Sequence, residues 1–465
     1  MRNARPASTL IVACAALAAS ANAQETQLGS DFRREGQALQ QDCSSFSFQS
    51  IGSCAYTLFT DHPMHIAVGS IAPQDGFGFG PAFVAHWTPN ESWRLSWDVD
   101  GVVSTNKSWR AGAYMTAVWD RHRGIVVTPG GGGAAASNLA VQEQPVFHLL
   151  VQSISLGTLG YFGLGPDTSD TARSIFGMRE TVAGVNATWP IIQKWSISLY
   201  GEANGRFVNI RPGSGQSVPS TQLLYSPVTA PGLASQPAFA QFGEGVRAAP
   251  ALAGGHVRLN YSVTLKEYVA ADSTYSFERL TTDLSHQFPL YLRTRRLLPS
   301  GFNGPDDCSV SAGQHSCPAV TRNLEGSFNL RFLMDQSFVP SGHLVPFYFQ
   351  PTLGGSDIDG NPTLASYQDY RFRAPNDILA EASFEHSIYG PFGLTAILDE
   401  GKVALARSDL DFTHLRHSYS VGLTLRAGGF PMVWLLFAWG GHEGTHTTAA
   451  MNTSLLGGSA RPSLY

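Results

Sequence analysis

The sequence predicts an all-β protein: a transmembrane antiparallel β-barrel of about sixteen strands, preceded by a short N-terminal periplasmic segment. Apolar and polar residues alternate over segments of ten to fifteen residues, whereas strands of soluble proteins usually have about five or six. Periodicity typical of a helix is nearly absent. Tryptophans stand near the segment ends, as interfacial girdles require, at positions 87, 93, 109, 119, 189, 195 and 439.

The first 23 residues have the organisation of a removable export signal. Arg2 and Arg5 supply positive charge, residues 10–19 are uninterrupted apolar, and Ala21-Asn22-Ala23 is a small-residue cleavage site. A ten-residue helix is only ~15 Å long, half of the ~30 Å hydrocarbon core, so this segment does not anchor the chain. We therefore expect a signal peptide at 1–23, a periplasmic segment at 24–64 and a barrel at 65–465.

Composition limits the classes of function. Charged residues are 14% of the chain, against roughly 25% in typical soluble domains, and the formal net charge is −5. A mildly acidic chain without a Lys/Arg run is not a nucleic-acid binder. The best remaining apolar stretch, residues 430–441, contains Pro431 and is shorter than the ~20 residues that a membrane helix needs. We therefore expect the partner of the wall to be outer-membrane lipid, with the chain in the bacterial outer membrane.

Alternation is clearest in residues 255–266, where an apolar set faces one way and polar residues face the other. We expect that set (Val257, Leu259, Tyr261, Val263 and Leu265) to face lipid. A soluble antiparallel sandwich also fits alternating strands, but the segment lengths and the tryptophans favour the barrel. The predicted strands are 65–72, 77–88, 93–105, 107–121, 145–158, 174–188, 193–209, 236–252, 255–270, 274–290, 321–335, 378–389, 393–405, 415–427, 430–441 and 445–456.

In a barrel of this kind, alternate connections between strands should be short periplasmic turns. With the N-terminus in the periplasm, tight periplasmic turns are expected at 89–92, 189–192, 253–254, 390–392 and 428–429. Two connections break the rule, because the stretches around 130–133 and at 291–320 are long where short turns are expected.

Four cysteines follow the export signal and form two close pairs. In an oxidising compartment this favours two local disulfides, Cys43–Cys54 and Cys308–Cys317. A zinc site made from all four is the alternative, but the two pairs are far apart in the sequence.

The longest connection, residues 337–377, lies between the eleventh and twelfth predicted strands. Its motifs and those of the next two strands are, in chain order, Leu353-Gly354-Gly355, Leu364-Ala365-Ser366-Tyr367, Tyr370-Arg371-Phe372-Arg373, then Glu381 and Glu385, then Asp399-Glu400-Gly401. This order resembles the barrel of the bacterial surface-antigen family, part of the outer-membrane protein assembly and translocation superfamily. That family's sixth extracellular loop carries Leu-Gly-Gly, a Val/Leu-Arg-Gly-Tyr/Phe tetrad and an Arg-Phe-Arg-like stretch, and its thirteenth strand carries Asp-any-Gly. Residues 161–169 also look like a recurrent stretch of its barrel-only members.

The resemblance spans about residues 65–456 and implies a barrel that acts in protein insertion or translocation by lateral opening of a seam. It implies client proteins or a periplasmic partner, with no cofactor and no catalytic residue. The chain departs from the family in two places. Residues 24–63 are too few for one of its periplasmic polypeptide-transport-associated domains, and Ala365 and Ser366 replace the arginine and glycine of the tetrad.

In the family the long loop folds into the lumen and the tetrad arginine docks on the inner wall. Here we expect residues 345–375 to fold inward, with Arg371 or Arg373 paired to Glu381 or Glu385. The alternative is that both arginines lie in solvent. For the whole chain, a passive or structural plugged barrel or pore is the second hypothesis, and a secreted soluble hydrolase is the third.

One motif suggests a different chemistry. His442-Glu443-Gly444-Thr445-His446 satisfies the His-Glu-x-x-His pattern of zinc proteases, which needs both histidines on one helical face. Because glycines and threonines surround it, we expect a polar extracellular loop between the last two strands and no metal site.

Overall fold

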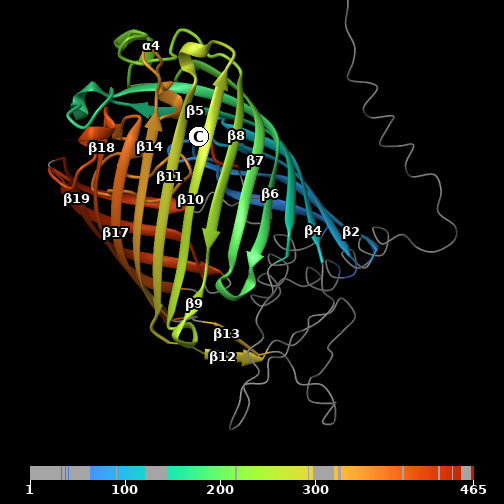
Figure 1. Ribbon diagram of the computed structural model, residues 1–465. Coiled ribbons are helices and arrows are strands. Elements are labelled where there is room, and N and C mark those ends of the chain that lie inside the picture. Colours follow the sequence, from blue (N-terminus) through green and yellow to red (C-terminus); the bar gives the residue numbers. More distant parts are fainter. Residues whose placement is uncertain are drawn as a thin grey trace, which may run out of the picture.

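The computed structural model describes residues 33, 37 and 40, and then 63–90, 92–120, 144–214, 217–291, 293–296, 319–322, 326–389, 392–427, 430–441, 443–451 and 462–465. Long strands, each antiparallel to the next along the chain, form one curled sheet (Figure 1). Its strands are β1 (Met64–Ser70), β2 (Phe77–Asn90), β3 (Trp93–Ser104), β4 (Trp109–Trp119), β5 (Val146–Tyr161), β6 (Ser174–Ile192), β7 (Ile197–Pro212), β8 (Phe239–Ala248), β9 (Ala251–Leu252), β10 (Val257–Ala270), β11 (Phe277–Pro289), β14 (Gly326–Phe338), β17 (Asn376–Tyr389), β18 (Phe392–Ala404), β19 (Arg416–Ala427), β20 (Phe430–Gly441) and β21 (Gly444–Met451).

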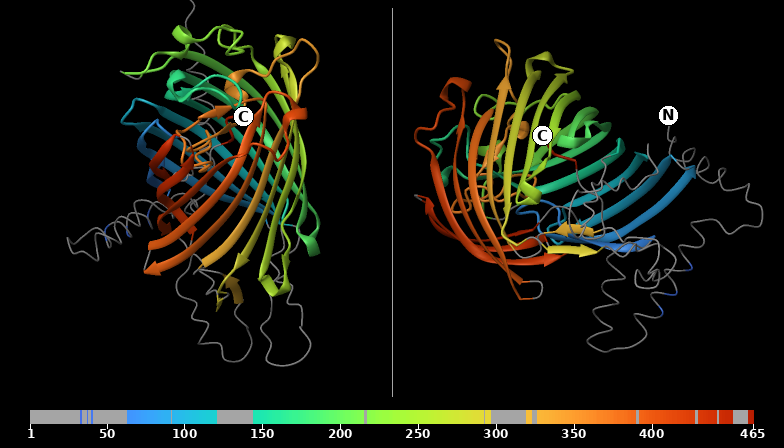
Figure 2. Two further views of the ribbon diagram at one scale, coloured as in Figure 1. Left: turned by 90° about the vertical axis from the view of Figure 1, so that its left-hand side faces the viewer. Right: turned by 60° about the horizontal axis from the view of Figure 1, so that its bottom comes forward.

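The sheet holds 17 strands, and the two-residue β9 continues the line of β8 along β10, so sixteen strands make up the wall. The prediction of an all-β antiparallel barrel with about sixteen strands is confirmed. Figure 2 shows the sheet bending round until the blue and red strands approach each other. The wall strands range from 7 residues in β1 and 8 in β21 to 19 in β6.

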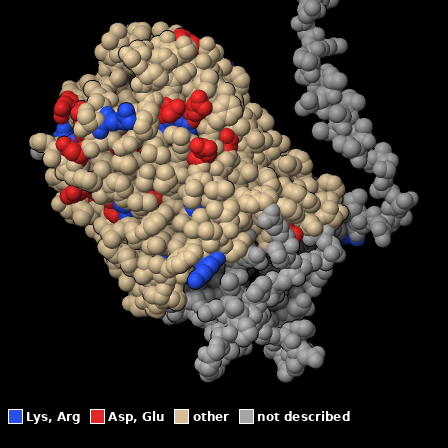
Figure 3. All heavy atoms as spheres, in the orientation of Figure 1, with Lys and Arg blue, Asp and Glu red and all other residues tan. Residues whose placement is uncertain are grey.

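The two faces of β10 are assigned as the alternation predicts. Val263 points outward with 43% of its side chain exposed, while Lys266 points into the lumen. Period two then places Val257, Leu259, Tyr261 and Leu265 on the outer face with Val263. Exposed apolar side chains continue around the wall, as in Val151, Phe242, Val421 and Phe437. Most of the wall seen in Figure 3 is uncharged, and the charged side chains gather in its upper half. An apolar outer band is the pattern of a wall that faces lipid.

Aromatic side chains gather at one end of the barrel, the end that carries β9 in Figure 1. Trp93 stacks on Trp119 with ring centroids 6.1 Å apart, and Trp119 lies 5.6 Å from Trp189. Phe147 lies within 6.2 Å of both Trp93 and Trp189. Their register pairs them with outward positions of neighbouring strands, so they form part of the predicted girdle.

The turns at this end differ from prediction in two places. The turn predicted at 189–192 belongs to β6, and the chain turns instead through η2 (Gln193–Trp195) with Ser196 at φ +45°. The strand predicted at 321–335 begins at Gly326, because residues 319–322 form β13 (Ala319–Arg322) and pair with β12 (Arg293–Arg296). The turn at 253–254 is present within η3 (Ala253–Gly255), whereas residues 390–391 and 428–429, the stretch 130–133 and all four cysteines lie outside the described residues.

The opposite end, which we call the α4 end, carries α4 (Thr221–Leu224) and the short helical turns η1 (Asp170–Ala172), η4 (Ser273–Tyr275) and η6 (Arg407–Asp409). Within the described part of the chain, no helix is long and apolar enough to cross a membrane. The largest cluster of buried apolar residues lies inside the barrel, where side chains of β5, β6, β8 and β10 meet residues 345–349.

Candidate functional site

Residues 345–375, in the connection between β14 and β17, fold into the lumen and form the candidate site. Two short strands, β15 (Thr352–Leu353) and β16 (Phe372–Arg373), pair with each other and close the base of this excursion. The backbone amide of Gly165 donates to the carbonyl of Arg373 at 2.8 Å, which attaches the β5–β6 connection to β16. The inward fold expected from the sequence is therefore present.

The Leu-Gly-Gly motif permits the turn that follows β15. Gly354 and Gly355 have φ of +111° and +62°, a region that side-chain-bearing residues rarely adopt. A Cβ on Gly354 would lie 2.5 Å from the Cβ of Arg371, and one on Gly355 would lie 2.5 Å from the backbone nitrogen of Asp369. The two glycines thus let the outgoing and returning arms of the loop touch.

Aromatic side chains of η5 (Phe347–Phe349) fill the lumen near the α4 end. Phe347 packs edge-on against Phe176 at 4.9 Å, and Phe349 packs edge-on against Phe239 at 5.0 Å. Arg279 of β11 donates from Nη2 to the carbonyl of Phe349 at 2.6 Å. Burial of three consecutive aromatic residues, each at most 1% exposed, fixes the position of this arm.

The returning arm packs against the opposite wall. Leu364, Tyr367 and Phe372 form a second apolar cluster with Leu353 and with residues of β17 and β18. Gly401, the glycine of the Asp-any-Gly motif, makes room for this contact. A Cβ there would meet the carbonyl oxygen of Ile378 at 2.8 Å and the side chain of Leu353 at 3.1 Å.

Arg371 binds two other inter-strand segments at the α4 end, one between β5 and β6 and one between β20 and β21. Its Nε donates to Glu443 Oε1 at 2.6 Å, and its Nη1 and Nη2 donate to the hydroxyl and carbonyl of Thr168. The guanidinium also lies over the ring of Phe162, 5.0 Å from the centroid. Its side chain is only 3% exposed, so these contacts replace water around a buried charge.

Arg373 is equally buried but has no acid among its hydrogen-bond partners. Its Nη1 donates to the carbonyls of Phe347 and Gln350 at 2.7 and 3.3 Å, and these bonds tie β16 to η5. Burial lowers the pKa of Arg373 to about 10. The expected pairing of Arg371 or Arg373 with Glu381 or Glu385 is therefore wrong. The reason is distance along β17, because a strand rises ~3.3 Å per residue and both glutamates lie well below its start.

Glu381 instead belongs to a polar cluster on the inner wall. It is directly opposite Arg331 of β14 and Asp399 of β18 in the sheet register. Arg331 donates to Asp283 of β11 at 2.8 Å, and Asp399 lies beside the backbone amides of Leu364 and Ala365. Asp399 thus connects the returning arm of the loop, through these amides, to the polar cluster of the wall. Glu385 lies farther along β17, opposite Ser327 and Thr395.

The altered tetrad is accommodated by small neighbours. Ala365 is 1% exposed and packs against Leu436 and Ala438 of β20. The backbone amide of Ser366 donates to the hydroxyl of Ser418 on β19 at 2.9 Å. Tyr367 approaches Gly441, where a Cβ would lie 2.6 Å from its ring. The returning arm therefore rests on β19 and β20 without an arginine.

Acidic residues at the tip of the loop are also buried. The backbone amide and side-chain amide of Asn361 both donate to Asp357, at 2.8 and 2.9 Å. Burial, together with repulsion from the neighbouring Asp359, raises the pKa of Asp357 to about 6.

Two residues that hold the loop were not assigned this role from the sequence. Thr168 lies in the stretch 161–169, which looks like a recurrent stretch of the family. That resemblance does not indicate which residue Thr168 binds. Glu443 belongs to the His-Glu-x-x-His motif. The structure places it between β20 and β21, with His446 on β21, and His442 lies outside the described residues. A β-hairpin cannot put two histidines on one helical face, and Glu443 binds Arg371. Within the residues that the structure describes, no cluster of three or more His, Cys, Asp or Glu could hold a metal ion.

These features define the class of the molecule: an antiparallel β-barrel whose lumen is filled by one of its own long loops. No family model and no curated protein matches the sequence. Among solved structures, BamA from Haemophilus ducreyi lacking POTRA domains 1–3 has 11% identity and a TM-score of 0.45, over 83% of this chain and 66% of that one.

Two structures of CdiB are also similar. CdiB from Escherichia coli has 12% identity and a TM-score of 0.45, over 82% of this chain and 59% of that one. CdiB from Acinetobacter baumannii has 11% identity and a TM-score of 0.42, over 83% and 58%. The chain therefore spans between 58% and 66% of the length of these three proteins.

Proposed function

We propose that this chain is a barrel of the bacterial outer membrane that acts in protein insertion or translocation by opening between its first and last strands, without bond chemistry. The apolar outer band supports placement in lipid. The filled lumen supports a role other than free diffusion through a pore. Client proteins, and a periplasmic partner that delivers them, belong to the proposal.

The junction between β1 and β21 is the natural place for opening. Every other neighbouring pair of wall strands is joined by an antiparallel ladder, and most of these pairs are consecutive along the chain. With 7 and 8 residues, β1 and β21 are also the two shortest wall strands. In the part of the chain that the structure describes, β1 pairs with β2 and β21 pairs with β20, and no ladder joins β1 to β21. Opening there breaks no ladder, whereas strands such as β5 and β6, with 16 and 19 residues, are held together by a long one.

The observation that carries the proposal is a clasp made by two adjacent residues of the long loop. The hydroxyl of Tyr370 donates to the carbonyl of Pro73 at 2.8 Å, in the β1–β2 connection. Arg371 binds Glu443, in the β20–β21 connection. One short stretch of the loop therefore holds both terminal hairpins at the α4 end, and its release would free the junction.

A passive or structural plugged barrel is the second candidate. The observation that favours it is the altered tetrad, because Ala365 and Ser366 leave no arginine at the position where the family has one. In that case the loop is a permanent stopper, and the β1–β21 junction stays closed.

Locking the junction tests the proposal. Single cysteines along 64–70 are combined with single cysteines along 444–449 in a chain whose native cysteines are replaced by serine. The best cross-linked pair is reconstituted into liposomes, and assembly of a small reference barrel protein is followed by heat-modifiable migration on gels. We expect the reduced protein to accelerate assembly over protein-free liposomes, and the oxidised protein to lose that acceleration.

The matched control is a cysteine pair at Val151 and Ala183, which are opposite each other in the β5–β6 ladder. Oxidising that pair should leave the acceleration unchanged, because this ladder does not open. If the reduced protein gives no acceleration at all, the plugged-barrel function replaces the proposed one.

A further inference from the structure

Residues 462–465 follow the last strand of the sheet, yet they lie inside the barrel. The C marker in Figures 1 and 2 stands among the strands rather than at either rim. Leu464 is 1% exposed and belongs to the apolar cluster that contains Tyr268 and Phe349. The ring of Tyr465 lies 5.8 Å from the guanidinium of Arg279. Apolar and aromatic contacts therefore hold the segment inside the barrel.

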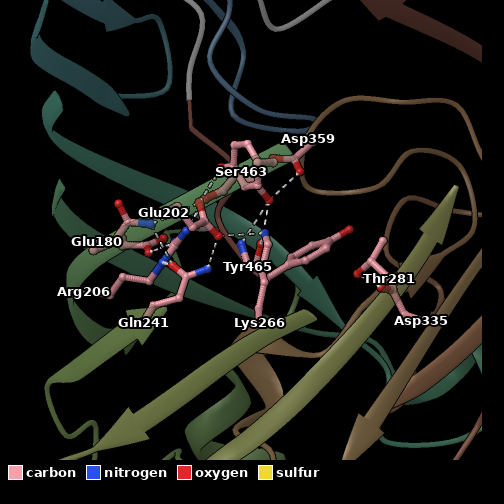
Figure 4. A network of polar contacts seen from close by, with 12 residues as sticks. Glu180, Glu202, Arg206, Gln241, Lys266, Thr281, Asp335, Asp359, Ser463 and Tyr465 are labelled. Carbon is pink, nitrogen blue, oxygen red and sulfur yellow. Dashed lines mark hydrogen bonds and ion pairs between the residues drawn. The ribbon is translucent and has the colours of Figure 1, made fainter. Parts of the chain in front are cut away.

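Charged groups of the wall bind the backbone of this segment (Figure 4). Arg206 of β7 donates from Nη2 to the carbonyl of Ser463 at 2.9 Å. Lys266 of β10 donates to the backbone oxygen of Tyr465 at 3.3 Å. On the loop side, the hydroxyl of Ser463 donates to Asp359 at 3.0 Å. Contacts of this kind recognise a peptide through its carbonyl groups.

The donors are held in place by partners other than the segment. Arg206 is 2% exposed and also donates to Glu180 at 2.6 Å and to Gln241. Gln241 in turn donates to Glu202 at 3.0 Å, and Glu202 lies 3.8 Å from the ammonium of Lys266. A site whose donors are oriented by their own network is preorganised for its ligand.

A cavity of about 370 Å³ adjoins the segment on the side away from the long loop. Pro462 and Ser463 form one of its sides, and the wall residues Thr116, His148 and Glu202 form others. The segment thus lies between this cavity and the tip of the loop, where Ser463 contacts Asp359.

From these contacts we propose that the lumenal face of β6, β7, β8 and β10 is a peptide-binding site. Its occupant is the segment Pro462-Ser463-Leu464-Tyr465 of the same chain, held by Arg206 and Lys266 through backbone oxygens and by Leu464 in the apolar cluster. The segment is a reversible ligand, and a peptide of the same sequence takes its place when it leaves.

The first test uses the full chain with Leu464→Asp, because a carboxylate is strongly unfavourable in an apolar cluster and should expel the segment. A fluorescent Pro-Ser-Leu-Tyr peptide is titrated, as the amide and as the free acid, and binding is measured by anisotropy. We expect the variant to bind at least tenfold tighter than the wild type, whose site is occupied. The comparison of amide and acid shows which form Lys266 prefers.

The matched control peptide is Pro-Ser-Asp-Tyr, which should not bind either protein. Equal binding of Pro-Ser-Leu-Tyr to both proteins, or no binding to the variant, would overturn the proposal.

A second measurement does not depend on the folding of that variant. Leu464→Cys and, separately, Val228→Cys are made in a chain whose native cysteines are serine, and labelling by a maleimide is timed. Val228 is 85% exposed, so it reports the rate of an open site. We expect Leu464→Cys to react at least tenfold more slowly, and equal rates would show that the segment does not occupy the site.

Discussion

Arg371 is the residue on which docking of the long loop depends most. A guanidinium has five N–H donors, and at 3% exposure water cannot satisfy them. Glu443 and Thr168 accept from three of its nitrogens, and Phe162 covers its face. Because the partners belong to the β5–β6 and β20–β21 connections, one side chain joins three separate parts of the barrel.

Replacing Arg371 by alanine should release the loop. Removing one member of a buried ion pair costs ~3 kcal/mol or more, because the partner is left without its counter-charge. We expect the free energy of loop opening to fall by about that amount, measured by hydrogen exchange of residues 352–373.

The matched control is Arg407→Ala, which removes an exposed arginine that lies over Phe338 and should leave loop exchange unchanged. The double variant with Glu443→Ala should open less than Arg371→Ala alone. Additive effects would mean that the two residues do not act as a pair.

Gly401 illustrates a residue whose role is to leave space. Gly401→Ala would place a methyl group against Leu353 and a backbone carbonyl, so we expect a loss of ~1–3 kcal/mol in barrel stability, with faster proteolysis of the loop. Urea unfolding in detergent measures the first effect. Gly101→Ala on β3 is the control, since nothing lies within 4 Å of a Cβ there. Equal losses in the two variants would show that contact with Leu353 is not the cause.

Asp357 should make the tip of the loop sensitive to pH. Its pKa of about 6 in the docked loop is above the ordinary value of 3.8, so the docked state binds the proton more tightly than the open state. Docking is therefore strongest below pH 4 and weakens as pH rises to about 6, by at most ~3 kcal/mol. Hydrogen exchange of residues 352–373 should be slower at pH 5 than at pH 7 after correction for intrinsic rates. An Asp357→Asn chain should lose most of this difference, and an unchanged difference would assign it to another group.

At the scale of elements, strand parity decides what each residue touches. On β10 the odd positions face outward and the even ones line the lumen, where Lys266 and Tyr268 meet the segment 462–465 and Arg279. A shift of one residue in the strand register would turn the apolar residues of β10 inward and its polar residues outward. The alternation of apolar and polar residues therefore specifies the register. The same parity gathers Trp93, Trp119 and Trp189 into a girdle at one end.

Val263→Arg tests the outer face of β10. A positive charge at the middle of a lipid-facing strand costs ~2–4 kcal/mol, so we expect slower assembly and a lower urea midpoint in lipid vesicles. Val263→Leu, which keeps the site apolar, should behave like the wild type. Assembly of the arginine variant at the wild-type rate would mean that this face does not meet lipid.

At the scale of the whole molecule, two separate segments fill the barrel. Residues 345–375 enter from the α4 end, and residues 462–465 occupy the layer beneath their tip, where Ser463 meets Asp359. The first segment also contacts the connections next to both terminal strands, through Tyr370 and Arg371. One loop thus both occludes the lumen and holds the connections beside the two terminal strands.

Removing both loop arginines should make this linkage measurable. The Arg371→Ala, Arg373→Ala double variant loses the contacts to Glu443 and Thr168 and those to the carbonyls of Phe347 and Gln350. We expect higher single-channel conductance in planar bilayers and faster loop proteolysis than in the wild type. If both quantities stay at wild-type values, the arginines do not hold the loop.

The number of strands could be predicted because alternation is a local signal, and most boundaries lie within four residues of the predicted ones. Residues 321–322 show the limit, since they continue the pattern of the next strand but pair with β12. The inward loop followed from the order of motifs that resembles a known family. Its partners did not follow, because Arg371 and Glu443 are 72 positions apart and no local pattern joins them.

Alternation and segment length in the sequence were enough to predict long amphipathic strands, the outward residues of β10 and the long connection at 337–377. The pairing of charged side chains became known only from the fold, because it depends on how far along each curled strand a side chain lies. For this reason Arg371 binds Glu443 rather than Glu381 or Glu385, and Arg331 binds Asp283. The lumenal position of residues 462–465 could not be predicted from the sequence either. The segment carries no motif, and the residues that bind it, Arg206 and Lys266, come from two different strands that only the fold brings together.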